Sequence, residues 1–271
     1  MKTVILCIVT FFGVLNAGPK VVAKFGQSEC PWSEQLKIEV WNSSTFQALL
    51  EGAGIEREES EASTGNVPLL TLVTSEGEEI GSLGYLLITP EKYVDLFKEM
   101  LTIHTLCHSL DDFNAAQLLH FYRKSEVLNM TACSGKLLEA GLAKDTGVDF
   151  LIEKYSTIVK EHPRRAQKVK QQIRERKPDD SATEWELALL SFQARREKMN
   201  EDSKIVLPLV KFLKSYGSKD KDYAWRCHLV LAEYYRDRNL VEKAKHHAKH
   251  AAEGAPHELR EMIINIGDEA A

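Results

Sequence analysis

One cysteine stands at the start of a stretch that can form a helix. Cys30 follows a short β-type run at 21–25 and precedes Pro31. Proline suits the first turn of a helix, because the N–H that it lacks would have no helical partner there. The unpaired N–H groups and partial positive charge at a helix start favour a thiolate and lower the pKa of a cysteine. Cys30 is therefore a candidate nucleophile.

A second signal lies further along the chain, at Val67-Pro68. This pair immediately precedes the apolar run LLTLV at 69–73. Proline is unusual next to a buried strand unless its peptide bond forms a special turn. We therefore expect a proline loop at the start of this strand.

The elements that must position these residues alternate between strand and helix in the first hundred residues. Apolar runs bounded by turn residues predict strands, and apolar stripes behind capping residues or proline predict helices. The expected strands are 21–25, 69–73 and 79–86, and the expected helices are 31–41, 44–50 and 91–100. This order predicts an α/β domain.

The region 20–101 resembles the thioredoxin superfamily. Cys30-Pro31-Trp32-Ser33 stands where that family has its C-x-x-C motif, and Val67-Pro68 stands where it has its cis-proline loop. The hairpin and helix that follow match the closing units of the fold. The resemblance implies that Cys30 attacks disulfides and that Pro31, Trp32, Val67 and Pro68 line the substrate groove.

The chain departs from this pattern at Ser33, which replaces the second cysteine. A hydroxyl can hydrogen-bond the Cys30 thiolate, but it cannot complete a two-electron redox cycle. Isomerisation does not need the second cysteine, because a thiol of the substrate can release the enzyme. Reduction of a glutathionylated or sulfenic-acid cysteine by a single enzyme thiol would not need it either. A degenerate site with an inert Cys30 is the alternative. In another alternative, Cys107, Cys133 or Cys227 resolves Cys30.

The N-terminal residues predict targeting. Lys2, thirteen uncharged residues from Thr3 to Leu15 and small Ala17 resemble a secretory signal peptide cut after Ala17, although an uncleaved anchor is the alternative. No later stretch is long and apolar enough to span a bilayer. We therefore expect a periplasmic protein without a membrane span after cleavage.

Composition narrows the classes of partner. The formal net charge of −5 gives no general attraction for nucleic acid. Five cysteines are too few for a disulfide scaffold, so we expect cysteines to act chemically and not as struts. The expected partners are cysteine-containing secreted or envelope proteins.

From about residue 104 onward, strand signals disappear and helical periods take over. We expect three parts: a signal peptide at 1–17, a thioredoxin-like domain at 18–103 and an all-α helical domain at 104–271. Between Trp225 and Pro256 the spacing of small and large residues resembles a tetratricopeptide repeat (TPR), with a tight turn at Asn239. The TPR-like residues are Leu231, Ala232, Tyr235, Ala244, Ala248, Ala251 and Pro256. An ordinary helical bundle is the alternative.

Four weaker candidates remain in the helical part. His104, Cys107 and His108 imitate a metal site but lack a fourth ligand, so we assign no metal. The three histidines at 246, 247 and 250 have lysine neighbours and predict a solvated, pH-sensitive helix face. Cys133 and Cys227 lie among apolar residues and are expected to be small buried fillers. The basic run 164–177 predicts a solvated helix, with an acidic protein partner as the alternative.

Together these patterns predict an enzyme that exchanges thiols and disulfides without a cofactor, most simply a disulfide isomerase. Cys30 would be its nucleophile, Ser33 would support the thiolate, and the helical domain would hold the client. The alternative is a non-catalytic chaperone or scaffold.

Overall fold

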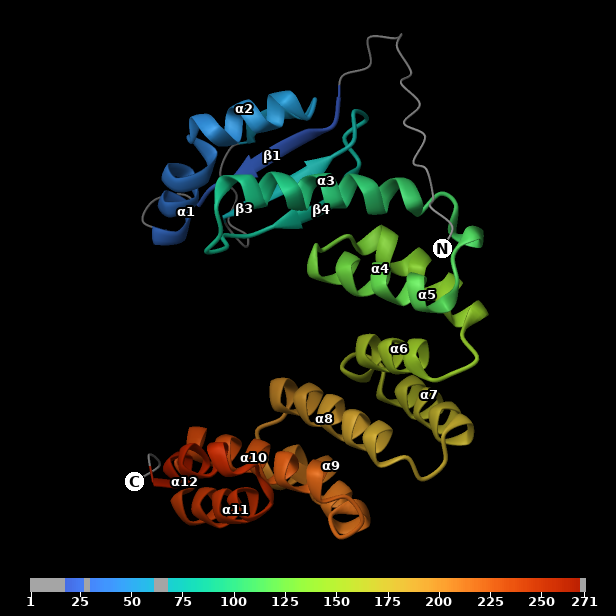
Figure 1. Ribbon diagram of the computed structural model, residues 1–271, viewed down its shortest axis with the longest axis vertical. Helices are drawn as coiled ribbons and strands as arrows, with labels where there is room; N and C mark the ends of the chain where they lie inside the picture. Colours follow the sequence, from blue (N-terminus) through green and yellow to red (C-terminus); the bar gives the residue numbers. More distant parts are fainter. Residues whose placement is uncertain (1–17, 27–29, 61–67, 269–271) are drawn as a thin grey trace. The chain divides into compact units, whose positions relative to one another are not determined.

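The chain forms two compact units, Met1–Lys144 and Asp145–Ala271 (Figure 1). The computed structural model describes residues 18–26, 30–60 and 68–268. The expected signal peptide, Val67 and the last three residues lie outside these ranges. Among the described residues, no helix is long and apolar enough to cross a membrane.

A mixed sheet of four strands forms the centre of the first unit (Figure 1). Its order is β2-β1-β3-β4, in which β1 and β2 are parallel and the other neighbours are antiparallel. The strands are β1 (Lys20–Lys24), β2 (Glu56–Ser60), β3 (Leu69–Val73) and β4 (Glu79–Leu83). The strands β1, β3 and β4 confirm the strands predicted at 21–25, 69–73 and 79–86.

The strand β2 was not predicted, because its sequence EREES carries no apolar alternation. It is an edge strand, and charged side chains are typical of edges that must not pair with another chain. Its exposed glutamates pair with lysines of neighbouring elements: Lys20 Nζ lies 3.0 Å from Glu58 Oε2, and Lys37 Nζ lies 2.7 Å from Glu59 Oε1.

The helices of this unit begin where proline or serine predicts them. The helix α1 (Pro31–Leu36) continues directly into the π-helix η1 (Lys37–Trp41), and α2 (Ser44–Gly52) is capped by the Ser43 side chain. The helix α3 (Pro90–Leu106) is longer than expected. Phe46 of α2 and Phe97 of α3 are fully buried, and their ring centroids lie 6.5 Å apart. The fully buried side chains around them are Leu36, Leu50, Leu70, Leu72, Tyr93 and Met100.

Two further helices, α4 (Ala115–Val127) and α5 (Thr131–Lys144), belong to the same compact unit. The turn between them covers the outer edge of β4: the Ser82 N–H donates to the Leu128 carbonyl at 3.1 Å, and Asn129 Nδ2 donates to the Ser82 carbonyl at 3.0 Å. Gly81 permits this approach, because a Cβ there would lie 2.8 Å from the Leu128 oxygen. The first unit therefore extends past residue 103, where we expected the thioredoxin-like domain to end.

The second unit contains only helices among its described residues. Successive helices pack in pairs, as the sequence predicts. The helices are α6 (Asp149–Val159), α7 (Pro163–Arg176), α8 (Ser181–Lys198), α9 (Asp202–Tyr216), α10 (Lys221–Asp237), α11 (Val241–Gly254) and α12 (Arg260–Asp268). Short 3-10 turns at Leu110–Asp112 and His257–Leu259 complete the two units.

In the α10–α11 pair, most residues of the TPR-like pattern are buried. Leu231 and Ala232 of α10 and Ala244 and Ala251 of α11 are fully buried. Asn239 has a φ of 55°, a left-handed conformation that asparagine tolerates better than most residues, and it forms the predicted turn.

Candidate functional site

Cys30 is the N-cap residue of α1, as its spacing to Pro31 predicts. It is partly exposed and carries a thiol. Its carbonyl accepts hydrogen bonds from the N–H groups of Ser33 at 3.0 Å and Glu34 at 3.2 Å, so the backbone at Cys30 is fixed by the first turn of the helix. The sulfur is thereby placed at the open end of α1.

Ser33 faces Cys30 across this first turn. The Ser33 side chain is 5% exposed, and its Oγ accepts a hydrogen bond from the Gly26 N–H at 3.0 Å. Because that bond occupies a lone pair of Oγ, the hydroxyl hydrogen remains available to the sulfur. The side-chain hydrogen bond from Ser33 lowers the pKa of the Cys30 thiol, with help from the N–H groups of Ser33 and Trp32 and against the charge of Glu34. The site therefore favours a thiolate.

Sheet register brings the Pro68 region to the same edge of the sheet as Cys30. Lys24, at the end of β1, pairs with Leu69, at the start of β3. Cys30 follows β1 along the chain, and Pro68 immediately precedes β3 and is buried. The expected groove residue Val67 lies outside the described residues, so only the Pro68 half of the proline loop is described.

Trp32 forms an aromatic wall with Tyr85, which no pattern in the sequence indicates. Its ring stacks on Tyr85 at 5.5 Å with 30° between the planes. Tyr85 Oη donates a hydrogen bond of 2.8 Å to Glu39 Oε2, which raises the pKa of Tyr85. Trp32 remains 55% exposed, so most of its ring is available for contact.

The segment after β4 is held in place by a buried tyrosine. Tyr93 Oη accepts a hydrogen bond from the Leu86 N–H at 2.6 Å and donates to the Gly84 carbonyl at 3.1 Å. Burial raises the pKa of Tyr93 to about 12, so the hydroxyl stays protonated and can continue to donate. These bonds position Tyr85 beside Trp32. No local pattern in the sequence indicates this role, since the buried stripe of α3 already accounts for Tyr93.

Exposed apolar side chains follow Tyr85 along the chain. Leu86, Leu87 and Ile88 follow Tyr85 and are 39%, 87% and 37% exposed. Exposed apolar groups that gather in one place are typical of contact surfaces. We call Trp32, Tyr85, Leu86, Leu87 and Ile88 the aromatic-aliphatic surface of the site.

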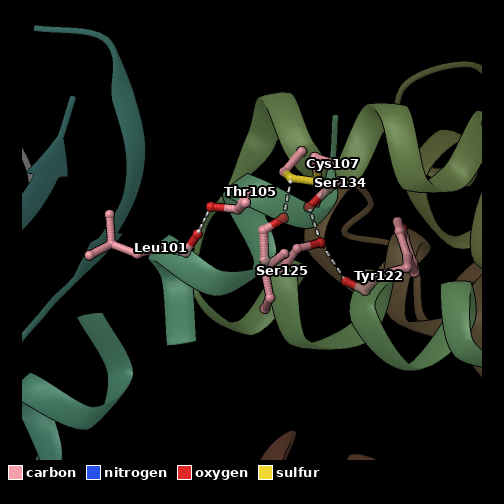
Figure 2. Close-up of a disulfide and its surroundings, with 8 residues drawn as sticks. Leu101, Thr105, Cys107, Tyr122, Ser125 and Ser134 are labelled. Atoms are coloured by element: carbon pink, nitrogen blue, oxygen red, sulfur yellow. Dashed lines mark hydrogen bonds between the residues drawn. A yellow bond between two sulfur atoms is a disulfide. The ribbon is translucent and has the colours of Figure 1, made fainter. Parts of the chain in front are cut away.

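Cys107 and Cys133 form a disulfide, with their Cα atoms 6.1 Å apart (Figure 2). The expectation that Cys133 is only a buried filler was therefore wrong, and so was the expectation that no cysteine acts as a strut. The bond joins the end of α3 to the start of α5. Beside it, Ser125 Oγ and Ser134 Oγ lie 2.8 Å apart, and Ser125 Oγ donates to the Tyr122 carbonyl at 2.7 Å (Figure 2).

This pairing decides which cysteines can assist Cys30. Cys107 and Cys133 are nearly buried and occupied by each other. Cys227 belongs to the second unit and is fully buried. Burial raises its pKa, which disfavours the thiolate. The prediction of Cys227 as a buried filler is confirmed. None of the three is a thiolate poised to resolve Cys30.

Two stretches with histidines remain from the sequence analysis. Cys107 of the HTLCH stretch is taken by the disulfide, and no group of three or more potential ligands in the described ranges could hold a metal ion. The solvated face predicted for 246, 247 and 250 is wrong at His247. That ring is half-buried and stacks on Tyr235 at 5.5 Å, and its Nδ1 lies 2.9 Å from Nδ1 of His228.

Comparison with known proteins adds one relative. A curated protein from Chlamydia pneumoniae, thioredoxin-related protein DsbJ, is 29% identical over 163 residues, which cover 57% of this chain and 47% of the relative. The chain is thus similar to a thioredoxin-related protein. It spans about half the length of that relative. No family model matches the chain, and no solved structure matches it significantly. The likeness supports the superfamily resemblance inferred from the residues around Cys30.

Proposed function

We propose that this protein exchanges thiols and disulfides in client proteins, with Cys30 as the nucleophile and isomerisation as the net reaction. The observation that carries the proposal is the hydrogen bonding of the Cys30 sulfur by Ser33 at the open end of α1, which lowers the pKa of the thiol. The thiolate is the reactive form of cysteine in disulfide exchange. The relative supports this chemistry at the level of the superfamily.

The proposed steps need only thiols and disulfides. The Cys30 thiolate attacks one sulfur of a wrong client disulfide, so a mixed disulfide forms and the other client sulfur leaves as a thiolate. That thiolate attacks a second disulfide of the client. A client thiolate then attacks the mixed disulfide and restores the Cys30 thiolate. No net electrons are transferred, so a second enzyme cysteine at position 33 is not required.

The aromatic-aliphatic surface supplies a place for an unfolded client segment. Trp32 follows Cys30 by two residues in the chain, is 55% exposed and stacks on Tyr85. We propose that Pro68 and Val67 border the same groove, as in the superfamily. The helical unit, as a TPR-like array of helix pairs, would hold the client. The clients would be cysteine-containing secreted or envelope proteins of the periplasm.

The proposal is tested by measuring the Cys30 pKa and the refolding of a scrambled disulfide substrate with the same preparations. The rate of iodoacetamide alkylation against pH should show a midpoint that rises in Ser33→Ala, because that substitution removes the principal hydrogen bond to the sulfur. Scrambled ribonuclease should recover activity with the native protein and not with Cys30→Ser. Recovery at equal rates with Cys30→Ser would refute the catalytic proposal.

A second candidate function is a non-catalytic chaperone that uses both units for contact. The replacement of the resolving cysteine by Ser33 favours it, because a site that cannot expel a trapped client by its own disulfide suits holding. This function predicts that Cys30→Ser still suppresses aggregation of a reduced client while disulfide exchange is absent in both proteins.

A further inference from the structure

The second unit contains a groove lined by the end of α6 and by α7, α8 and α9, which are coloured olive to orange in Figure 1. It consists of two adjoining cavities of about 570 Å³ and 470 Å³. Both cavities are lined by Lys170, Arg174, Pro208 and Lys211, so they are continuous with each other. We call this the basic groove.

Positive charge dominates the lining. Eight lysine and arginine side chains line the groove, against only two acidic ones, Asp179 and Glu184. The basic residues are Lys160, Lys170, Arg174, Arg195, Lys198, Lys211, Lys214 and Lys219. This excess stands out in a chain whose formal net charge is −5.

Some of these charges are already neutralised. Arg174 Nη2 donates to Glu184 Oε2 at 2.8 Å, which occupies one of the two acidic groups. Lys160 pairs with Glu197, and Lys198 Nζ lies 3.0 Å from Glu161 Oε1. These pairs leave the middle of the groove uncompensated.

Three of the groove's charges without an ion pair are Lys170, Lys211 and Lys214. In the part of the chain that the structure describes, none of the three forms an ion pair. Lys170 is the most enclosed, and burial together with the charges of Arg174, Arg195 and Lys211 lowers its pKa. A bound anion would offset both the repulsion and the loss of hydration.

The walls between the charges are partly apolar and aromatic. Phe212 and Tyr216 stack at 5.5 Å with 18° between their planes, and Pro208 and Leu207 lie along the same helix. Each cavity alone has the size of a site for a drug-sized ligand, which is far larger than one phosphate needs. Length, spaced cations and apolar walls together suit a peptide whose carboxylates alternate with apolar side chains.

We propose that the basic groove binds an acidic peptide segment of a partner protein, with Lys170 and Lys211 as its central carboxylate contacts. This assigns a function to part of the basic run 164–177, of which Lys170 and Arg174 line the groove beside Ala166. It also names the chemistry that the helical unit selects in a client. Binding by the groove does not depend on reaction at Cys30, so the two proposals fail separately.

The experiment measures fluorescence anisotropy of a labelled octapeptide of alternating glutamate and leucine, titrated with the full chain. A glutamine–leucine octapeptide is the uncharged control. The test variant is Lys170→Gln with Lys211→Gln. The matched control is Lys168→Gln with Lys204→Gln, which removes the same charge from α7 and α9 at positions that do not line the groove. Thermal unfolding is recorded for each protein. If the double variant unfolds at a lower temperature than the native protein, the single variant Lys211→Gln replaces it as the test variant.

We expect the test variant to weaken binding of the acidic peptide by about tenfold, because two charge contacts are lost. The control variant should change it by less than about twofold, since exposed and distant charges contribute little. Higher salt should weaken binding as well. Equal binding of the two peptides, or equal losses in the two variants, would overturn the proposal. Tighter binding of a single-stranded oligonucleotide or of inorganic phosphate than of the acidic peptide would also overturn it.

Discussion

The Cys107–Cys133 disulfide should stabilise the first unit by restricting its unfolded chain. The two cysteines are separated by 26 residues, and the closed loop contains the whole of α4. For a loop of this length the chain-entropy relation gives about 3.5 kcal/mol at 25 °C. With a urea dependence of about 2 kcal/mol per molar, losing the bond should lower the urea midpoint of this unit by about 1.5–2 M.

The assay is urea unfolding of the full chain, followed by circular dichroism with and without a reductant. The variant is Cys107→Ala with Cys133→Ala, and the matched control is Cys227→Ala, which removes a buried thiol from the second unit. The native protein should lose stability on reduction, whereas the double variant should be weaker from the start and insensitive to reductant. Cys227→Ala should keep the full response of the first unit to reductant.

Either of two results would refute this reasoning. If reductant leaves the native midpoint unchanged while mass spectrometry shows that Cys107 and Cys133 have become alkylated, the bond forms but contributes no stability. If both cysteines are alkylated in the unreduced, unfolded protein, the disulfide is absent in solution.

Three further predictions concern the site and the second unit. Ser33→Cys should let position 33 form a disulfide with Cys30 and should add reductase activity, measured by insulin turbidity with a thiol donor; unchanged activity would show that the two side chains cannot meet. Trp32→Ala should weaken capture of an unfolded client several-fold without changing the alkylation pKa of Cys30, because the substitution removes the exposed ring but keeps the backbone N–H that lowers that pKa. The pKa values of His228 and His247 are lowered to about 4 by burial and by neighbouring histidines. As pH falls, these two histidines therefore take up protons at a higher pH in the unfolded chain than in the folded protein. The free energy of unfolding of the second unit should therefore fall between about pH 6.5 and pH 4 and level off below that range, and a flat profile by chemical denaturation would contradict this.

The local signals around Cys30 could be interpreted from the sequence because they act over a few residues. A proline directly after the cysteine and a serine three residues beyond it determine the first turn of α1, and the structure keeps both in the expected places. The apolar run at 69–73 likewise forms β3, since a buried strand needs little more than continuous apolar residues. These predictions depend on chemistry that neighbours along the chain share.

The failures share a different cause. The strand β2 was missed because its residues pair with β1 through backbone hydrogen bonds, and such pairing does not require apolar side chains. Cys133 was interpreted as an isolated filler because its partner lies 26 residues earlier, on another helix. Tyr85 was not selected because its role comes from stacking on Trp32, 53 residues before it in the chain.

The sequence alone determined the candidate nucleophile, the serine in place of a second cysteine and the change from mixed to helical structure near residue 104, since periodicity and capping act within a few turns of chain. Tertiary structure alone decided that two cysteines pair, that a tyrosine from beyond β4 stacks on Trp32, and that lysines from separate helices meet around one groove. Each of these depends on how close distant segments come, and that distance is set by the packing of whole helices and strands.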